Sequence, residues 1–211
     1  MTVPLLILAA FEPELAPIRE LIGTHSDIRM ESVGTGVIDA AVNTSRLLSE
    51  TSSPGLRVLF VGSVGAYDMA VPLLSFVTAE KVIFTDYANS AMRAFLPPIV
   101  PIVSIANTVL REKVEQTTQS KREFVYTTPS ITSDLETADI LRHSTGAGFE
   151  SLELFAVARA CDTFSTPWAS LSAVTNHIGP EGHQEWERNF AKAAKLTAEK
   201  VAAVLKGLIL A

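Results

Sequence analysis

Polar side chains follow four runs of apolar residues that are typical of buried strands. The first run continues into AAFEPE, which contains Glu12 and Glu14, and the later runs end in VGTG, in VGSVG around Ser63, and in VTN at Asn176. Ligands in open α/β sheets bind at the carboxyl ends of the strands. We therefore expect these four segments to meet at one edge of a sheet and to form a site.

The first and third segments each have a chemical and a structural interpretation. A carboxylate at Glu12 or Glu14 would serve as a general base, but acids are also common in a first helical turn because they complement the helix dipole. The glycines around Ser63 let the backbone approach a ligand beside a hydroxyl group, but they also suit tight turns between a strand and a helix. Neither segment decides the function alone.

Two further acids and one amide are candidates for binding. Glu150 and Glu153 lie three residues apart in the segment 149–161, which we predict to be a helix. The other positions of this segment are mostly apolar, so at least one acid is expected on the core side, where two sugar hydroxyls would satisfy it. The alternative is an ordinary acid at a helix N-terminus. Asn176 is expected to project its amide at the edge of the sheet or, alternatively, to form a turn.

Other catalytic sites find no support in the sequence. It contains no GxSxG or HExxH motif, and its four histidines lack the spacing of metal ligands: His25, His143, His177 and His183. Cys161 lies in an apolar helical segment and is expected to be a core residue. Trp168 and Trp186 are expected to be packing anchors, although Trp186 could border the site. We expect neither a metal nor a cofactor.

Composition and charge limit the class of protein. The chain has 211 residues, 47% of them hydrophobic, which fits one soluble domain over 1–211. The net charge of −6, without a basic cluster, argues against nucleic acid as a partner. The apolar start at 3–10 lacks the basic region of a signal peptide, and no segment approaches the ~20 apolar residues of a membrane-spanning helix. We therefore expect a cytoplasmic protein with no membrane partner.

The periodicity of apolar residues predicts strands that alternate with helices, which indicates an α/β domain with a largely parallel sheet. The expected strands are 3–10, 28–36, 56–65, 75–84, 122–128 and 166–176. The expected helices are 14–23, 37–50, 104–115, 134–143, 149–161 and 183–208. Three prolines and scattered apolar residues predict a loop over 85–103.

Taken in order, these segments resemble the nucleoside phosphorylase and nucleosidase family, particularly its methylthioadenosine/adenosylhomocysteine nucleosidases and its futalosine hydrolases. The resemblance rests on AAFEPEL, VGTGVIDAA, VGSVGAYD, FESLELFAVARACDTFSTPW and SAVTN, whereas 85–120 aligns poorly. It implies a three-layer α/β/α sandwich with a central mixed, largely parallel sheet. It also implies a homodimer in which the partner closes part of the pocket.

The resemblance assigns a role to each candidate residue. Glu14 matches the acid that activates the attacking water, and Ser63 matches the serine near that water or the ribose. Glu153 matches the acid that binds the ribose hydroxyls, and Thr132 falls near the segment that binds the base. Asn176 falls where the adenine-specific nucleosidases carry an aspartic acid that protonates purine N7.

Two departures from the family pattern bear on the substrate. The amide of Asn176 can donate to both N7 and the carbonyl of a 6-oxopurine, which favours a hypoxanthine nucleoside and, within this family, futalosine. Ser172 replaces an arginine that supports the water-activating acid. Glu12 and Glu14 would repel phosphate, where the phosphorylases of the family carry arginines, so the resemblance implies hydrolysis.

The predicted function is therefore hydrolysis of the N-glycosidic bond of futalosine, a step of menaquinone biosynthesis. One alternative is a methylthioadenosine/adenosylhomocysteine or aminofutalosine nucleosidase, and a phosphorylase is a more distant one. Because both the arginine and the aspartic acid are absent, a purine-nucleoside binding protein without catalysis is a further alternative.

Overall fold

The computed structural model describes residues 5–51 and 53–209 of the chain. The strand expected at 3–10 begins at Leu5 in the described part, and residues 3 and 4 lie outside it. No helix in these ranges is long and apolar enough to span a membrane.

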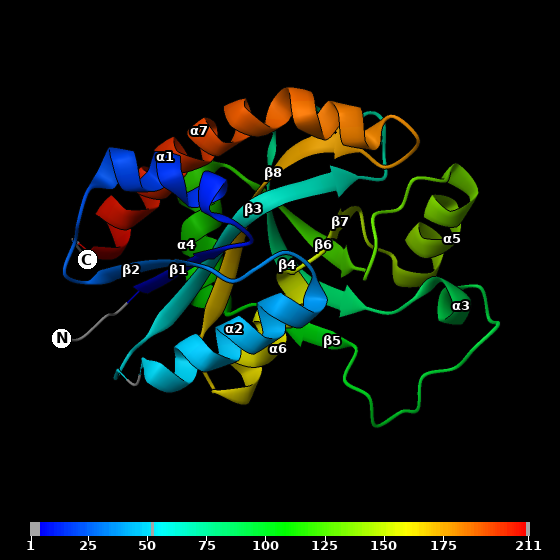
Figure 1. Ribbon diagram of the computed structural model, residues 1–211, viewed down its shortest axis with the longest axis horizontal. Helices are drawn as coiled ribbons and strands as arrows, with labels where there is room; N and C mark the ends of the chain where they lie inside the picture. The colour runs from blue at the N-terminus through cyan, green and yellow to red at the C-terminus, as the bar shows by residue number, and fades with distance from the viewer. Residues whose placement is uncertain (1–4, 52, 210–211) are drawn as a thin grey trace.

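The described residues form a sheet of eight strands (Figure 1). The strands are β1 (Leu5–Ala9), β2 (Ile28–Ser32), β3 (Arg57–Ala66), β4 (Phe76–Phe84), β5 (Val103–Ile105), β6 (Lys121–Thr127), β7 (Phe149–Ser151) and β8 (Trp168–His177). Their order is β2-β1-β3-β7-β6-β4-β5, and β8 pairs with β3 and β4. The pairs β3–β7, β4–β5 and β4–β8 are antiparallel, and the other pairs are parallel. The predicted mixed, largely parallel sheet is confirmed.

Helices cover both faces of the sheet and complete the predicted three-layer sandwich. They are α1 (Glu12–Ile22), α2 (Val37–Glu50), α3 (Tyr87–Ser90), α4 (Thr108–Thr118), α5 (Leu135–Thr145), α6 (Leu154–Thr163) and α7 (Gly182–Ile209). In Figure 1, α1 and α7 lie on one side of the sheet and α2 and α6 on the other. Successive side chains of β1 alternate between the two cores: Leu5 and Ile7 pack on the side of α1 and α7, and Leu6 and Leu8 on the other. Burial on both faces explains the continuously apolar sequence of this strand.

Parallel pairing brings the candidate residues to one edge of the sheet. β1 pairs parallel with β3, and β3 pairs parallel with β8, so the carboxyl ends of all three point the same way. A register shift between Val64 and Gly65 leaves Thr175 as an extra residue on β8, which places Asn176 opposite Gly65. A bulge of this kind changes the direction of the side chains beside it.

The prediction of a helix at 104–115 is wrong for its first residues. Val103–Ile105 forms β5 instead and pairs with β4, and the helix begins only at Thr108. The start is set by Asn107, whose side chain accepts a hydrogen bond from the backbone N–H of Leu110. The loop predicted just before this segment contains the one-turn helix α3, which is capped by Asp86.

The helix predicted at 149–161 is also wrong in its first residues. Phe149–Ser151 forms β7, which pairs with β3 on one side and β6 on the other, and helix α6 begins at Leu154. The backbone hydrogen bonds that two neighbouring strands offer outweigh the helical spacing of the apolar residues. Glu150 and Glu153 therefore do not share a helix: Glu150 lies in β7, and Glu153 is the N-cap residue of α6.

Candidate active site

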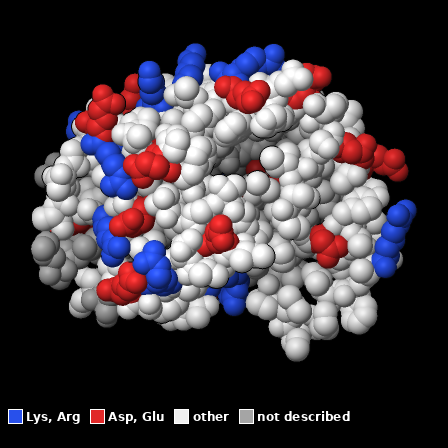
Figure 2. All heavy atoms as spheres, in the orientation of Figure 1, with Lys and Arg blue, Asp and Glu red and all other residues white. Residues whose placement is uncertain are grey.

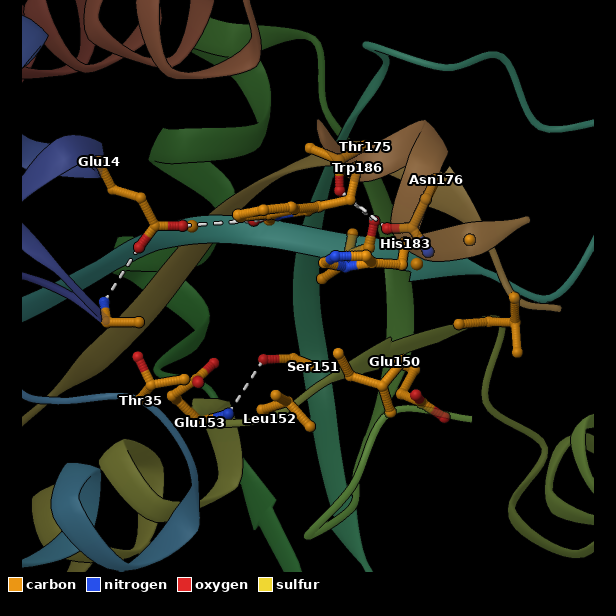
Figure 3. Close-up of a pocket in the computed structure, with 18 of the residues that line it drawn as sticks. Glu14, Thr35, Glu150, Ser151, Leu152, Glu153, Thr175, Asn176, His183 and Trp186 are labelled. Atoms are coloured by element: carbon orange, nitrogen blue, oxygen red, sulfur yellow. Dashed lines mark hydrogen bonds between the residues drawn. The ribbon is translucent and has the colours of Figure 1, made fainter. Parts of the chain in front are cut away.

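A pocket of about 360 Å³ opens at the carboxyl ends of β1, β3 and β8. The hollow lies near the centre of the face in Figure 2, and Figure 3 shows the side chains around it. Five candidate residues line this pocket: Glu14, Ser63, Glu150, Glu153 and Asn176. Thr132 is not among the lining residues, although its neighbour Ile131 is.

Glu14 is a buried carboxylate at the start of α1. Its Oε2 accepts a hydrogen bond from the backbone N–H of Ala10 at 3.1 Å, and its Oε1 accepts one from the hydroxyl of Ser63 at 3.3 Å (Figure 3). Burial, and secondly the charge of Glu153, raise the pKa of Glu14 from 4.5 to about 8. A carboxylate with this pKa, held at a pocket wall, suits a general base near neutral pH. The neighbouring acid Glu12 is exposed and forms an ion pair with Arg19 instead.

Glu153 is joined to the glycine turn that follows β2. Its Oε1 accepts a hydrogen bond from the backbone N–H of Gly36 at 2.8 Å. Gly36 has a φ of 86°, a conformation that glycine adopts without strain, and it caps the N-terminus of α2. Burial raises the pKa of Glu153. This contact gives the VGTG segment a structural role and fixes a carboxylate in the pocket wall.

Asn176 presents its amide to the pocket in a fixed orientation. Its Nδ2 donates to the carbonyl oxygen of His177 at 3.2 Å, and its Oδ1 accepts from the hydroxyl of Thr175 at 3.0 Å. A carbonyl oxygen only accepts, so the nitrogen must lie on the side of His177. The second hydrogen of Nδ2 is then left for a ligand. The side chain fits because Gly65 and Gly182 lie against it without a Cβ atom.

Glu150 holds the segment that carries Ile131. Its Oε1 accepts from the backbone N–H of Thr132 at 3.0 Å, and its Oε2 accepts from the hydroxyls of Thr132 at 2.7 Å and Tyr67 at 2.9 Å. The backbone N–H of Thr132, a residue predicted to bind substrate, is thus directed to Glu150. Burial raises the pKa of Glu150. The sequence carried no signal for Tyr67, because this contact joins residues that are far apart in the chain.

Trp186 closes the pocket from α7. Its ring packs near Phe11, with ring centroids 6.5 Å apart, and near Phe190 at 5.0 Å. Its Nε1–H donates to the hydroxyl oxygen of Ser63 at 3.3 Å. The expected packing role therefore comes with a hydrogen bond into the site, for which the sequence carries no local signal.

The electrostatic character of the pocket is acidic. Glu14, Glu150 and Glu153 line it, whereas none of the described lining residues is Lys or Arg. Ser172, at the position where the resemblance implies an arginine, is buried in β8 opposite Gly62. Within the described ranges, no group of three or more His, Cys, Asp or Glu side chains is arranged to hold a metal ion.

Comparison with known proteins identifies the family to which this fold and pocket belong. The sequence matches the family model of the phosphorylase superfamily over residues 6–210. The chain therefore belongs to the phosphorylase superfamily, which confirms the resemblance to the nucleoside phosphorylases and nucleosidases.

Two sequence relatives carry different names. The chain is 26% identical over 195 residues to a 5′-methylthioadenosine/S-adenosylhomocysteine nucleosidase of Marinomonas sp., which covers 86% of this chain and 81% of the relative. It is 27% identical over 192 residues to the futalosine hydrolase of Streptomyces coelicolor, which covers 83% of this chain and 78% of the relative. These two relatives are about equally similar to the chain.

Solved structures share the fold. A Helicobacter pylori methylthioadenosine nucleosidase, in which one aspartate is replaced by asparagine, was solved with 5′-methylthioadenosine in the active site. It superposes with a TM-score of 0.88 at 18% identity, covering 98% of this chain and 100% of that chain. The native futalosine hydrolase of Helicobacter pylori has a TM-score of 0.86 at 17% identity and covers 96% and 97%.

The buried carboxyl of Glu14 predicts a pH-dependent gain of stability for Glu14→Gln. Because burial raises the pKa of Glu14 in the folded state, its ionisation lowers the unfolding free energy of the wild type. This loss of stability is absent below pH 4.5 and complete above about pH 8. Between about pH 5 and pH 9, the unfolding free energy of the variant should rise relative to wild type by about 1–4 kcal/mol. Urea unfolding at several pH values measures this difference. The exposed Glu12→Gln is the matched control, and an equal pH response of the two variants would contradict the burial argument.

A larger residue in place of Gly65 is predicted to displace the side chain of Asn176. A Cβ atom at Gly65 would lie 2.3 Å from Cδ1 of Ile178 and 2.9 Å from Nδ2 of Asn176, so both side chains must move. We expect Gly65→Ala to lower the unfolding free energy by about 1–3 kcal/mol and to weaken purine binding. Unfolding and calorimetric titration with hypoxanthine test this. Gly207→Ala in α7 is the control, because its Cβ would lie 3.4 Å from Cε of Lys113, an ordinary van der Waals distance. If Gly65→Ala leaves the affinity for purine unchanged, Asn176 does not bind the base.

Proposed function

We propose that this chain is a nucleosidase that hydrolyses the N-glycosidic bond of a purine nucleoside, with a hypoxanthine nucleoside such as futalosine as its substrate. The observation that supports this most strongly is the meeting of Glu14, Ser63, Glu153 and Asn176 around one pocket. These side chains provide a base, a hydroxyl, a second carboxylate and an amide donor. Both named sequence relatives, a nucleosidase and a hydrolase, agree with this class of reaction.

In the proposed reaction, Glu153 and Glu14 have separate tasks: Glu153 holds the sugar, and Glu14 activates water. The bond between C1′ of the ribose and N9 of the purine breaks first, and its electron pair leaves with the base. Glu153 accepts hydrogen bonds from the ribose hydroxyls and holds the sugar as its positive charge develops. Glu14 accepts a proton from water while the water oxygen bonds to C1′. A proton from solvent then neutralises the departing purine.

Water, rather than phosphate, is proposed as the nucleophile because of the charges around the pocket. Three glutamates line it, and no Lys or Arg does so in the described part. Where these carboxyls are ionised they would repel a phosphate dianion, and no cationic side chain in the described lining would attract it, whereas a neutral water can donate to Glu14. The raised pKa of Glu14, about 8, also gives this carboxylate the basicity that proton abstraction needs.

The preference for hypoxanthine rests on the orientation of Asn176. Its oxygen accepts from Thr175 and its nitrogen donates to the carbonyl of His177, and the second hydrogen of this nitrogen is an N–H donor available to the base. A 6-oxopurine offers acceptors at N7 and O6, whereas the 6-amino group of adenine is itself a donor. The alternative is a methylthioadenosine/adenosylhomocysteine or aminofutalosine nucleosidase, and the Marinomonas relative supports it equally by sequence. Only with futalosine as substrate would the enzyme belong to menaquinone biosynthesis.

The first experiment is free-base release measured by chromatography with the purified chain. Futalosine, inosine, methylthioadenosine and aminofutalosine are each offered with and without phosphate. Hypoxanthine released from futalosine without phosphate supports the proposal, adenine release supports the alternative substrates, and dependence on phosphate indicates a phosphorylase. Binding without release of base from any of them indicates a nucleoside-binding protein. Release must be measured, since the asparagine-substituted Helicobacter pylori relative holds methylthioadenosine in its active site.

Asn176→Asp is predicted to change the choice of base. The protonated acid can donate to N7, and the ionised acid can accept from a 6-amino group, but either form loses the fixed amide donor. We expect release from 6-amino relative to 6-oxo nucleosides to rise by at least about tenfold, or ~1.4 kcal/mol. The ratio of kcat/KM for the two classes of nucleoside is the readout. The control is Asn43→Asp, at a residue whose side chain donates a hydrogen bond to the carbonyl of Val33. An unchanged ratio would remove Asn176 from base selection.

We also propose that the chain forms a homodimer. Large apolar side chains are exposed on α2, in 91–102 and on β5: Ile38, Val42, Met92, Phe95, Ile99 and Ile105. Exposed apolar side chains in such number are typical of a protein interface.

Sedimentation velocity at micromolar concentration tests this proposal. We expect the wild type to sediment as a dimer and Phe95→Asp/Ile99→Asp to shift toward the monomer. Met69→Asp, also at an exposed apolar residue, is expected to leave the dimer intact. A monomeric wild type would refute the proposal.

A further inference from the structure

We infer that Trp186 is a positioning residue for Glu14 and that it acts through the hydroxyl of Ser63. The inference rests on the proposed role of Glu14 as the base that takes a proton from water. It goes beyond that proposal because it assigns a task in the reaction to an indole N–H on α7, outside the strand ends that supply the predicted site.

Two hydrogen bonds connect the three side chains in one direction. Nε1–H of Trp186 donates to Oγ of Ser63 at 3.3 Å, and the same hydroxyl donates to Oε1 of Glu14 at 3.3 Å. An indole nitrogen is a donor only, so it occupies a lone pair of the serine oxygen. The hydroxyl hydrogen must then point elsewhere, and Glu14 is the acceptor that it meets. Trp186 thus selects the rotamer in which Ser63 serves Glu14.

The indole is itself held in place by aromatic contacts. Its ring lies 5.0 Å from Phe190 and 5.9 Å from His183 by centroid distance, and it packs against Phe11. Phe11 is the N-cap residue of α1, the helix in which Glu14 lies. The indole ring therefore packs on the helix that carries Glu14. This contact fixes the indole N–H relative to the Glu14 carboxylate, so that Ser63 can bridge them.

Glu14 depends on this arrangement because few other groups stabilise its ionised form. In the described part of the chain, no Lys or Arg forms an ion pair with Glu14; the groups that lower its pKa are the backbone N–H groups of Ala10 and Phe11 and the hydroxyl of Ser63, which is the one side chain among them. The titratable side chains that face the pocket around it are Glu150, Glu153 and His183. Of these, the charge of Glu153 raises the pKa of Glu14. A hydroxyl that turned away from Glu14 would leave the base less able to ionise.

The test compares Trp186→Phe with wild type. The variant retains an aromatic ring at the pocket wall, but it loses the N–H together with part of the indole ring. Ser63 is then free to rotate, and the pKa of Glu14 should rise. Because the base works when ionised, the ascending limb of the kcat/KM profile should move to higher pH. At neutral pH, kcat/KM should fall by about three- to tenfold, with KM nearly unchanged.

A double-mutant cycle separates positioning from packing. If Trp186 acts through Ser63, then Trp186→Phe should have no further effect in a Ser63→Ala background. Multiplication of the two losses would show that the tryptophan acts independently of Ser63 and would overturn the inference. Trp168→Phe is the matched control, since its buried Nε1 has no hydrogen-bond partner among the described residues. Trp168→Phe should leave the pH dependence of kcat/KM unchanged.

A readout without turnover keeps this inference distinct from the proposed function. The titration of Glu14 is followed by carbon-13 NMR of glutamate carboxyls, with its signal assigned by loss in Glu14→Gln. A higher pKa in Trp186→Phe supports the positioning role even if no nucleoside is hydrolysed, in which case the proposed function alone fails. An unchanged pKa together with an unchanged pH profile would refute the positioning role.

Discussion

The burial of two carboxylates beside one pocket is the constraint on which the rest of the site depends. Burial raises the pKa of both acids, and the charge of Glu153 raises that of Glu14 further, yet the donors that reach them are uncharged backbone N–H groups and the hydroxyl of Ser63. Neutral donors stabilise a carboxylate without cancelling its charge, which is what the proposed roles of Glu14 toward water and Glu153 toward sugar hydroxyls require. A lysine or arginine in this pocket would lower their basicity and attract phosphate. The absence of such residues from the described lining therefore fits the proposed hydrolysis.

The scaffold supplies these donors by bringing distant segments of the chain together. The turn after β2 offers Gly36 to Glu153, and β3 offers Ser63 to Glu14. These contacts exist because β1, β2 and β3 are parallel, so that their carboxyl ends share one edge. Both faces of the strands are packed by helices, which excludes water and causes the raised pKa of the acids.

Much of this architecture could be predicted from the sequence, and the failures have a common cause. Continuous apolar runs and glycine turns located β1, β3 and β8, and the segment ends placed Glu14 and Asn176 at one edge. The failures, at β7 and β5, concern strands of three residues that exist only because neighbouring strands offer hydrogen bonds. Local periodicity does not report such partners. The same applies to the bulge at Thr175 and to the contact of Thr132 with Glu150, which set side-chain directions without a local signal.

The first turns of α7 connect the two ends of the site. Glu185 accepts hydrogen bonds from the backbone N–H of His177 at 2.7 Å and from its Nδ1 at 3.1 Å, which fixes the residue after Asn176. Trp186, the next residue, donates to Ser63 beside Glu14. Consecutive residues thus restrain the side that would bind the base and the side that would activate water. A displacement of this helix would disturb both at once, so the packing of α7 against α1 and β8 links the stability of the fold to the geometry of the reaction.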